Sequence, residues 1–312
     1  MTKLLVTGAL GHIGSRFIHG LTPGDFSEVV LVDNFATQRY CSLFDLPAGV
    51  PFRFVEADVC NADLNRLVAG MDAVIHLAAI TDAAGSFDRQ AQVERVNFDG
   101  TERVARACAA AKARLVFPSS TSVYGSAEEV VDEDCPIDEL KPQSPYADSK
   151  LRAERLLSEL GRTEGLRFIS CRFGTIYGVS PGMRFHTAVN KFAWQACMGQ
   201  PLSVWRTALH QRRPYLDLGD AVRALNFILR EDLFDRRIYN VLTENLTVND
   251  IVEELKKLVP DVKVSFVDTQ IMNQLSYQVA NERFRVRGFE FTGSYGKALA
   301  QTVQMLRHGR SA

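Results

Sequence analysis

Three glycines near the start of the chain, Gly8, Gly11 and Gly14, constrain its fold most strongly. They follow a run of leucine and valine that predicts a strand at residues 3–7, and they open a helical pattern at residues 13–21. Because glycine has no Cβ, such a turn lets the backbone approach a pyrophosphate, whose charge is stabilised at the helix N-terminus. The order of strand, glycine-rich turn and helix predicts the first unit of a dinucleotide-binding sheet.

Short runs rich in β-branched residues alternate with longer helical patterns through the first half of the chain. Further strands are predicted at residues 29–33, 52–56, 73–77, 114–117 and 167–171. Further helices are predicted at residues 62–69, 90–111 and 145–160. Alternating strands and helices form parallel βαβ units, so we predict an α/β fold with a doubly wound, Rossmann-type parallel sheet.

Asp33 ends the second predicted strand and indicates which dinucleotide the sheet binds. A carboxylate at this position accepts hydrogen bonds from the adenosine ribose and repels a 2′-phosphate, which favours NAD over NADP. A glycine-rich turn in an unrelated α/β fold is the alternative, and Asp33 argues against it. We therefore predict NAD as the cofactor.

Tyr146 and Lys150 lie one turn apart on the same face of the helix predicted at residues 145–160. A free phenol has a pKa near ~10, and a neighbouring ammonium together with a nicotinamide cation lowers that pKa. Tyr146 can then remove a hydroxyl proton while hydride leaves for the nicotinamide. Ser120, which follows the fifth strand, is expected to hold the substrate oxygen, with Asn97 as a supporting residue.

Residues after the other strands extend the predicted cofactor site. Asp58 can bond the adenine amino group while Val59 packs on the ring, although a helix N-cap explains Asp58 equally well. His76 is interpreted as structural. The predicted NAD-binding residues are Gly8, Gly11, His12, Ile13, Gly14, Asp33, Asn34, Asp58, Val59, Leu77, Ala78, Ala79, Asn97, Ser119, Tyr146 and Lys150.

Together these motifs resemble the extended short-chain dehydrogenases, the NAD-dependent epimerase/dehydratase family. The resemblance covers essentially the whole chain and rests on residues 8–14, 33, 76–79, 119–125, 146–150 and 172–178, with further likeness at residues 213–220 and 287–289. The family is known for oxidoreductase chemistry on nucleotide-linked sugars. The resemblance implies that Ser120, Tyr146 and Lys150 are the catalytic triad, that Lys150 bonds the nicotinamide ribose, and that Arg213 contacts a substrate diphosphate.

The segment after Ser120 bears on the reaction. The family's 4,6-dehydratases carry an Asp-Glu pair there, and its 3,5-epimerase/reductases carry a cysteine at the position of Ser122, whereas this chain has Thr121 and Ser122. A C4 epimerase needs no further acid or base. We therefore predict an NAD-dependent nucleotide-sugar epimerase that acts at C4 through a transient 4-keto sugar. The alternatives are a nucleotide-sugar or small-alcohol dehydrogenase with NAD as co-substrate, a nucleotide-sugar dehydratase, and a non-catalytic NAD-binding protein.

Polar residues near the predicted sugar site are the candidate substrate contacts. A capped surface helix explains the polar residues at 186 and 190 equally well. The predicted substrate-binding residues are Thr81, Ser122, His186, Asn190 and Arg213.

The regular alternation of predicted strands and helices ends after residue 178, where the predicted loops are longer. We predict an NAD-binding domain at residues 1–178, to which residues from about 213 to 241 return, and a smaller α+β lobe at residues 179–312 that mainly binds substrate. From the resemblance we expect a homodimer that pairs through the helices at residues 90–111 and 145–160.

Composition excludes several other classes of protein. The net charge is -1, which argues against nucleic acid or a membrane surface as a partner. The six cysteines form no CxxC pair, so we expect no metal site. The chain has no apolar run near the ~20 residues that span a bilayer and no signal-peptide pattern, so we expect a cytoplasmic protein.

Overall fold

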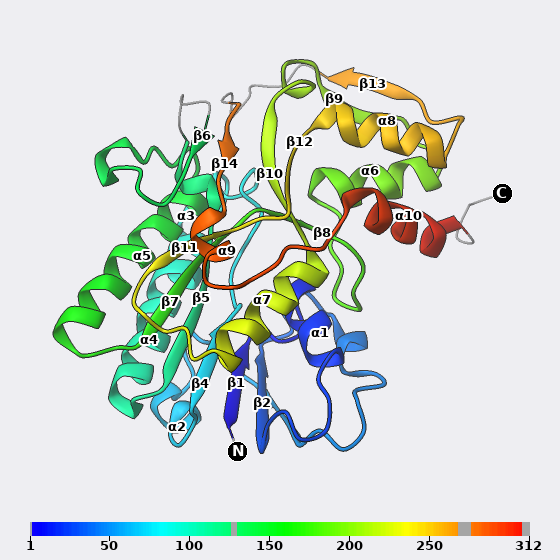
Figure 1. Cartoon of the computed structure of the whole chain (residues 1–312). Helices are drawn as coiled ribbons and strands as arrows, with labels where there is room; N and C mark the ends of the chain where they lie inside the picture. The colour runs from blue at the N-terminus through cyan, green and yellow to red at the C-terminus, as the bar shows by residue number, and fades with distance from the viewer. Residues whose placement is uncertain (1, 126–129, 268–275, 308–312) are drawn as a thin grey trace.

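The computed structural model describes residues 2–125, 130–267 and 276–307. Seven strands pair in parallel in the order β11-β7-β5-β4-β1-β2-β3. They are β1 (Lys3–Thr7), β2 (Glu28–Asp33), β3 (Phe52–Glu56), β4 (Ala73–His76), β5 (Arg114–Ser120), β7 (Phe168–Phe173) and β11 (Ile238–Val241). The order reverses between β1 and β4, which confirms the predicted doubly wound sheet (Figure 1).

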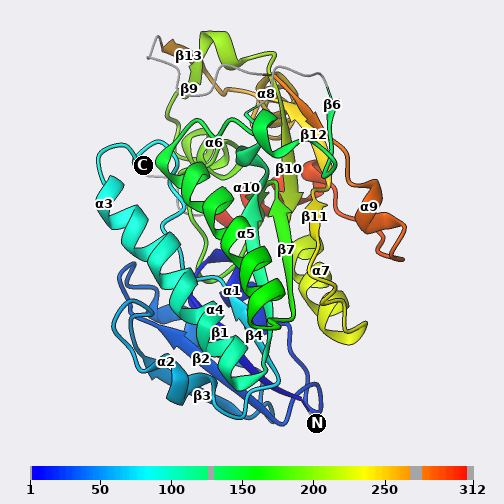
Figure 2. The ribbon, with the colours of Figure 1, turned by 90° about the vertical axis from the view of Figure 1, so that its left-hand side faces the viewer.

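Helices cover both faces of this sheet. On one face lie α1 (His12–His19) and α7 (Leu218–Arg230), and on the other lie α2 (Leu64–Val68), α4 (Gly100–Ala111) and α5 (Pro145–Thr163). Figure 2 shows α4 and α5 side by side across the second face. Apolar side chains from each helical layer pack on the sheet and form two separate cores, so both faces of every central strand are buried.

The helix predicted at residues 90–111 is interrupted. It consists of α3 (Gln90–Val93), a π-helical turn at Glu94–Asp99, and α4. The wider turn holds Asn97, whose side chain accepts a hydrogen bond from Ile80 N at 2.8 Å and donates one to Ile80 O at 2.9 Å. The spacing of apolar residues does not predict such a turn, because a π-helical turn adds one residue without breaking the helical pattern.

A third core lies above the sheet. It is enclosed by α6 (Ala188–Cys197), α8 (Val248–Leu258), α10 (Tyr295–Leu306) and β9 (Leu202–Trp205). Short sheets join it to the rest of the chain, and they contain β6 (Val130–Val131), β8 (Thr175–Tyr177), β10 (Arg212–Asp217), β12 (Glu244–Thr247), β13 (Val264–Val267) and β14 (Gln278–Val279). The short helix α9 (Glu282–Arg285) contacts β11.

The second half of the chain contributes to the large sheet at two places. Strand β11 pairs with β7 at its edge, and α7 packs beside α1. Strand β10, by contrast, pairs with β8 and β12 in a separate sheet. The predicted division of the chain near residue 178 stays a prediction, with β11 and α7 as the parts that lie with the sheet.

Candidate active site

The carboxyl ends of the central strands and the segment after β8 surround a cavity of about 480 Å³. The predicted site residues that line it are Gly8, Gly11, His12, Ile13, Gly14, Leu77, Ala79, Thr81, Ser119, Ser120, Ser122, Tyr146, Lys150, His186 and Arg213. Those that do not line it are Asp33, Asn34, Asp58, Val59, Ala78, Asn97 and Asn190. The fold therefore brings the glycine loop and the predicted catalytic residues to one cavity at the point where the strand order reverses.

The glycine loop leaves no room for side chains. Gly8 has a φ of +65°, and a Cβ there would lie 2.5 Å from Ala78 N. A Cβ on Gly14 would lie 2.5 Å from Ala9 O. No side chain caps α1 at its first residue, so its N-terminal N–H groups point toward the loop without a side-chain acceptor. This geometry suits a pyrophosphate, because backbone donors and the positive end of the helix dipole meet there.

The Asp33 carboxylate is hydrogen-bonded to the backbone of the glycine loop. It accepts hydrogen bonds from Leu10 N at 3.1 Å and from Phe35 N at 3.0 Å. The next predicted residue, Asn34, donates to Asp58 at 3.4 Å. Asp58 also accepts from Cys60 N at 2.8 Å, and the N-cap of α2 is Asp63. The N-cap explanation of Asp58 is therefore wrong for α2, since Asp58 closes the turn before that helix.

Two buried histidines bind neighbouring segments together. The ring of His76 lies 2.7 Å from Thr7 Oγ1 and 3.0 Å from Thr101 Oγ1, so both nitrogens have partners. His12 Nε2 lies 2.8 Å from Gly178 O and so links the glycine loop to the segment after β8. Burial lowers the pKa of each imidazole to about 3, so both are neutral at physiological pH.

Ser120, Tyr146 and Lys150 lie together as predicted from the motifs. Ser120 lies beside Tyr146, whose pKa its hydroxyl lowers, and accepts from Ser122 Oγ at 2.8 Å. Lys150 Nζ donates to Pro118 O at 2.8 Å, at the end of the strand that carries Ser120. Helix α5 starts at a serine N-cap with proline in its first turn, which fixes the start of this helix and thus the direction of both predicted catalytic side chains.

The electrostatics of Tyr146 differ from the expectation. Burial raises the pKa of the Tyr146 phenol, and the charge that opposes this rise is the Arg184 guanidinium, with the hydrogen bond from Ser120 as a further contribution. Burial also lowers the pKa of Lys150 to about 8, and the Glu154 carboxylate opposes that fall. The Tyr146–Lys150 motif predicts Lys150 as the cation that acts on the phenol, and the sequence does not single out Arg184 for this role.

Arg184 lies on the segment that covers the cavity. Its guanidinium donates to Thr81 Oγ1, so the two lining residues face each other across the cavity edge. His186 also lines the cavity, and burial together with the Arg184 charge lowers its pKa to about 4. No motif could have identified these contacts, because they depend on how the loop after β8 folds back over the sheet.

Asn190 differs from its predicted role. Its side chain is fully buried, accepts from Gly178 N at 3.2 Å and donates to Arg184 O at 3.0 Å. Both ends of the amide are therefore used to shape the covering loop, and the side chain does not reach the cavity. Asn190 lies in the first turn of α6. The sequence alone does not indicate whether a polar side chain at this position contacts a substrate or forms a structural hydrogen bond.

Basic side chains outnumber acidic ones in the cavity lining. The cations there are Arg39, Lys150, Arg184, Lys191 and Arg213. Among the described lining residues, Asp82 is the one carboxylate. Arg213 lies 5.1 Å from the centre of the Tyr277 ring, and Trp205 adds an indole to the far end of the lining. Such an excess of positive charge suits a ligand with more than one phosphate.

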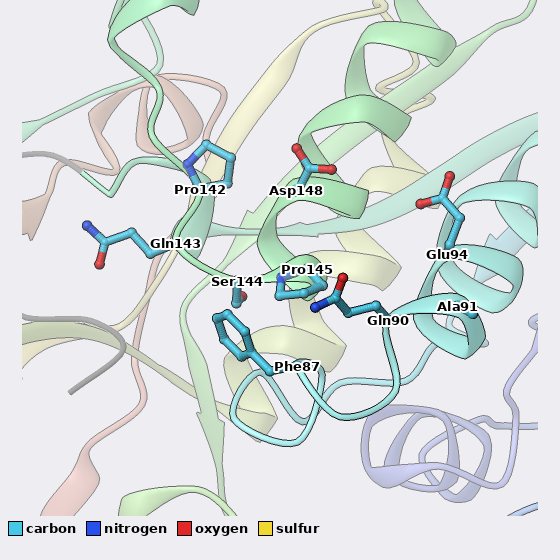
Figure 3. A pocket seen from close by; sticks show the side chains of 9 residues that line it. All are labelled: Phe87, Gln90, Ala91, Glu94, Pro142, Gln143, Ser144, Pro145 and Asp148. Atoms are coloured by element: carbon cyan, nitrogen blue, oxygen red, sulfur yellow. The ribbon is translucent and has the colours of Figure 1, made fainter. Parts of the chain in front are cut away.

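A second hollow of about 640 Å³ lies on the outer face of α3 and α5. Figure 3 shows Phe87 and Gln90 beside the turn that precedes α5, with Glu94 and Asp148 on the neighbouring helices. This hollow contains neither the glycine loop nor the predicted catalytic residues. We therefore assign the chemistry to the cavity of about 480 Å³.

Two negative findings apply to residues 2–125, 130–267 and 276–307. No group of three or more histidine, cysteine, aspartate or glutamate side chains in these ranges could hold a metal ion. No helix in them is long and apolar enough to cross a bilayer.

The sheet, the glycine loop and the Ser120, Tyr146 and Lys150 cluster define a short-chain dehydrogenase of the extended kind. The chain belongs to the NAD dependent epimerase/dehydratase family, whose model matches residues 4–241. This confirms the resemblance drawn from the motifs. The match runs through β11, so it includes the strand that completes the large sheet.

Known proteins with similar sequences and structures act on nucleotide sugars. A UDP-glucose 4-epimerase of Azospirillum brasilense is 31% identical over 253 residues, which are 77% of this chain and 68% of that protein. A trifunctional UDP-glucose 4,6-dehydratase/UDP-4-keto-6-deoxy-D-glucose 3,5-epimerase/UDP-4-keto-L-rhamnose-reductase of Arabidopsis thaliana is 28% identical over 96% of this chain. The chain spans only 46% of that plant protein.

A solved structure supports the same family assignment over nearly the whole chain. The UDP-glucuronic acid 4-epimerase of Bacillus cereus, in complex with UDP-glucuronic acid and NAD, superposes with a TM-score of 0.88. It is 25% identical and covers 98% of this chain and 99% of its own.

Proposed function

We propose that this protein is an NAD-dependent nucleotide-sugar epimerase that inverts C4 of the sugar through a transient 4-keto intermediate. The observation that carries the proposal is that Ser120, Tyr146 and Lys150 line one cavity, where Thr121 and Ser122 follow Ser120. Thr121 Oγ1 donates to Phe173 O at 3.3 Å, and Ser122 Oγ donates to Ser120. Neither is an acid or base at neutral pH, so the elimination expected of a dehydratase has no carboxylate pair at this position.

The described residues fit NAD. The glycine loop and the N-terminus of α1 would hold the pyrophosphate, the region of Asp33 and Asp58 the adenosine, and Lys150 the nicotinamide ribose. When bound, NAD would supply the hydride acceptor and donor that oxidation and reduction of a sugar hydroxyl require.

The chain's own residues would handle the proton. Ser120 would donate a hydrogen bond to the C4 oxygen, and Tyr146 would remove the hydroxyl proton as hydride leaves. The Arg184 charge favours the phenolate form of Tyr146. For return to the opposite face, the sugar must turn within the cavity, while the same tyrosine gives the proton back to the same oxygen.

The remaining cations would bind the substrate's own diphosphate. Arg213, Lys191 and Trp205 line the cavity, and Lys191 on α6 and Trp205 on β9 belong to elements that enclose the third core. The indole of Trp205 offers a flat apolar surface. A diphosphate prefers guanidinium and ammonium donors, and a base prefers an aromatic face. We propose a nucleoside diphosphate sugar as the substrate on these grounds, with contacts from Thr81, Ser122 and His186 to the sugar.

We propose a homodimer that pairs through α4 and α5. The exposed phenyl ring of Phe87 lies beside the start of α5 and gives this face apolar area. Light scattering at micromolar concentration should give twice the chain mass, and a monomer would contradict the proposal. We also propose a cytoplasmic location, because no two of the six cysteines, which all lie in the described ranges, form a disulfide, and this fits a reducing compartment. Cell fractionation tests the location.

Incubation with a panel of UDP-, dTDP-, GDP- and CDP-sugars tests the reaction. An epimerase converts one sugar to its C4 epimer in the NMR spectrum without net NADH absorbance at equilibrium. Stoichiometric NADH indicates the dehydrogenase alternative. A new methyl signal with loss of the C6 hydroxyl indicates the dehydratase. If no sugar changes and no NADH forms, the proposed function is wrong.

A further inference from the structure

A buried ion pair beneath the catalytic residues has no part in the proton transfer described above. Glu154 follows Lys150 by one helical turn on α5, so it continues the face that carries Tyr146 and Lys150. Its partner is Arg172 on β7. Their side chains are 2% and 3% exposed and form two parallel hydrogen bonds, Nε to Oε1 at 3.0 Å and Nη2 to Oε2 at 2.8 Å.

A third hydrogen bond ties this pair to the catalytic strand. Ser119 Oγ donates to Glu154 Oε1 at 2.5 Å. The preceding residue, Pro118, accepts the hydrogen bond from Lys150, and the following residue is Ser120. Consecutive positions at the end of β5 are therefore fixed by α5, and the Ser119–Glu154 bond lies between the two contacts on which catalysis depends.

We propose that Glu154 is a positioning residue of the catalytic centre, which together with Arg172 clamps the ends of β5 and β7 against the helix that carries Tyr146 and Lys150. This inference rests on the proposed use of Tyr146 and Lys150. Stability alone does not require charges at this position, because a buried ion pair costs desolvation and can be replaced by apolar side chains of similar volume. The two parallel hydrogen bonds between the guanidinium and the carboxylate, by contrast, fix the orientation of both side chains.

Glu154 also acts on the charge of Lys150. Two titratable groups interact electrostatically with Lys150: Glu154, one turn further along α5, and His76 from β4. His76 is neutral, and Arg172 is paired with the Glu154 carboxylate. Burial pushes the pKa of Lys150 down to about 8, and Glu154 is the carboxylate that opposes this effect. Loss of the Glu154 charge therefore leaves Lys150 deprotonated at a lower pH.

The Glu154→Gln substitution tests both effects, because it keeps the shape and removes the charge. We expect kcat to fall on the order of 10- to 100-fold, since small misplacements of catalytic groups have costs of this size, while KM changes little. The alkaline limb of the pH–rate profile should move to lower pH by roughly 1 unit. Glu94→Gln is the matched control, because it breaks an exposed ion pair with Arg152 on the same helix, at 2.7 Å. We expect wild-type kcat and pH profile for it.

A direct measurement of Lys150 does not depend on turnover. In protein labelled with ¹³C-lysine, the Lys150 resonance is assigned by its loss in Lys150→Met and then titrated. The Glu154→Gln protein should show a midpoint roughly 1 pH unit lower than wild type, and Glu94→Gln should show no shift.

If Glu154→Gln does not fold because Arg172 is left unpaired, the double variant Glu154→Leu with Arg172→Met replaces both charges. Its thermal unfolding should resemble that of wild type, while kcat and the Lys150 midpoint still fall. A folded variant of either kind with wild-type kcat and Lys150 midpoint overturns the inference. If instead the wild-type protein epimerises no sugar, the proposed function fails, and the NMR titration still decides whether Glu154 sets the charge of Lys150.

Discussion

The floor and the cover of the cavity are built in opposite ways. The floor, formed by β5, β7 and α5, pairs its buried charges internally, as in Glu154 with Arg172 and Lys150 with Pro118 O. The cover, formed by residues 178–191, brings Arg184 to the cavity with a buried Nε that has no hydrogen-bond partner among the described residues. In the floor, Arg172 Nη1 is also buried without a hydrogen-bond partner among the described residues, but the Arg172 charge is balanced by the Glu154 carboxylate. In the cover, Arg184 donates to the neutral Thr81 hydroxyl, so the cover is suited to a ligand that brings its own anionic groups.

The largest effect is expected in the floor, from Tyr146→Phe. Without the phenol oxygen, no group at this position can move the hydroxyl proton, and kcat should fall by roughly 10²- to 10⁴-fold. Steady-state kinetics on the substrate found in the sugar panel measures this. The control is Tyr295→Phe at the start of α10, outside the cavity lining. Wild-type turnover of Tyr146→Phe would contradict the mechanism.

Acid should weaken the junction of floor and cover. Burial lowers the pKa of His12 and His76 to about 3 in the folded protein, whereas the usual histidine value is 6.5. The unfolded chain therefore binds more protons between these values, and stability present above pH 6.5 is lost as the pH falls toward 3. We expect a loss on the order of 1 kcal/mol per histidine for each pH unit below 6.5. Urea unfolding at pH 7.5, 6.5 and 5.5 measures it, and equal stabilities throughout would refute the prediction.

Asn190→Ala separates a structural role in the cover from a substrate contact. The variant leaves Gly178 N and Arg184 O without their side-chain partner, so the free energy of unfolding should fall by about 1–3 kcal/mol. Chemical denaturation measures this. The half-buried Lys191 is not a suitable control position because it lines the cavity. The control is Gln200→Ala, which changes an exposed residue just beyond α6. Unchanged stability with a higher KM would instead favour direct contact with substrate.

The smallest effect is expected from Arg184→Met. The Tyr146 phenol loses the cation that favours its ionised form, so its pKa should rise and the acid limb of the pH–rate profile should move to higher pH. A shift of about 1 unit corresponds to roughly tenfold lower activity on that limb. Arg230→Met, in an exposed ion pair with Glu231, is the control. If the acid limb of the Arg184→Met profile does not move, the pKa of Tyr146 is set by groups of the floor alone.

The floor could be predicted in detail and the cover could not. Strand β1 and strand β3 begin and end at the predicted residues, and Tyr146 and Lys150 lie on one helical face beside Ser120, because these relations follow from local periodicity. The π-helical turn at residues 94–99 escaped prediction, since one extra residue in a helix leaves no pattern. The buried amide of Asn190 was interpreted as a possible contact because polarity alone does not indicate which way a side chain points.

By itself, the sequence determined the class of sheet, the glycine loop and the family, and it predicted the residues that we propose as the catalytic triad, since each depends on residues that are close in the chain or on motifs of fixed spacing. Only the tertiary structure decided which charges meet. Arg184 comes to Tyr146, and Arg172 to Glu154, from strands and loops that are brought together by the packing of the sheet against α5 and by the return of the chain after β8. Electrostatic effects depend on distance in space and on burial, and neither can be obtained from separation along the chain.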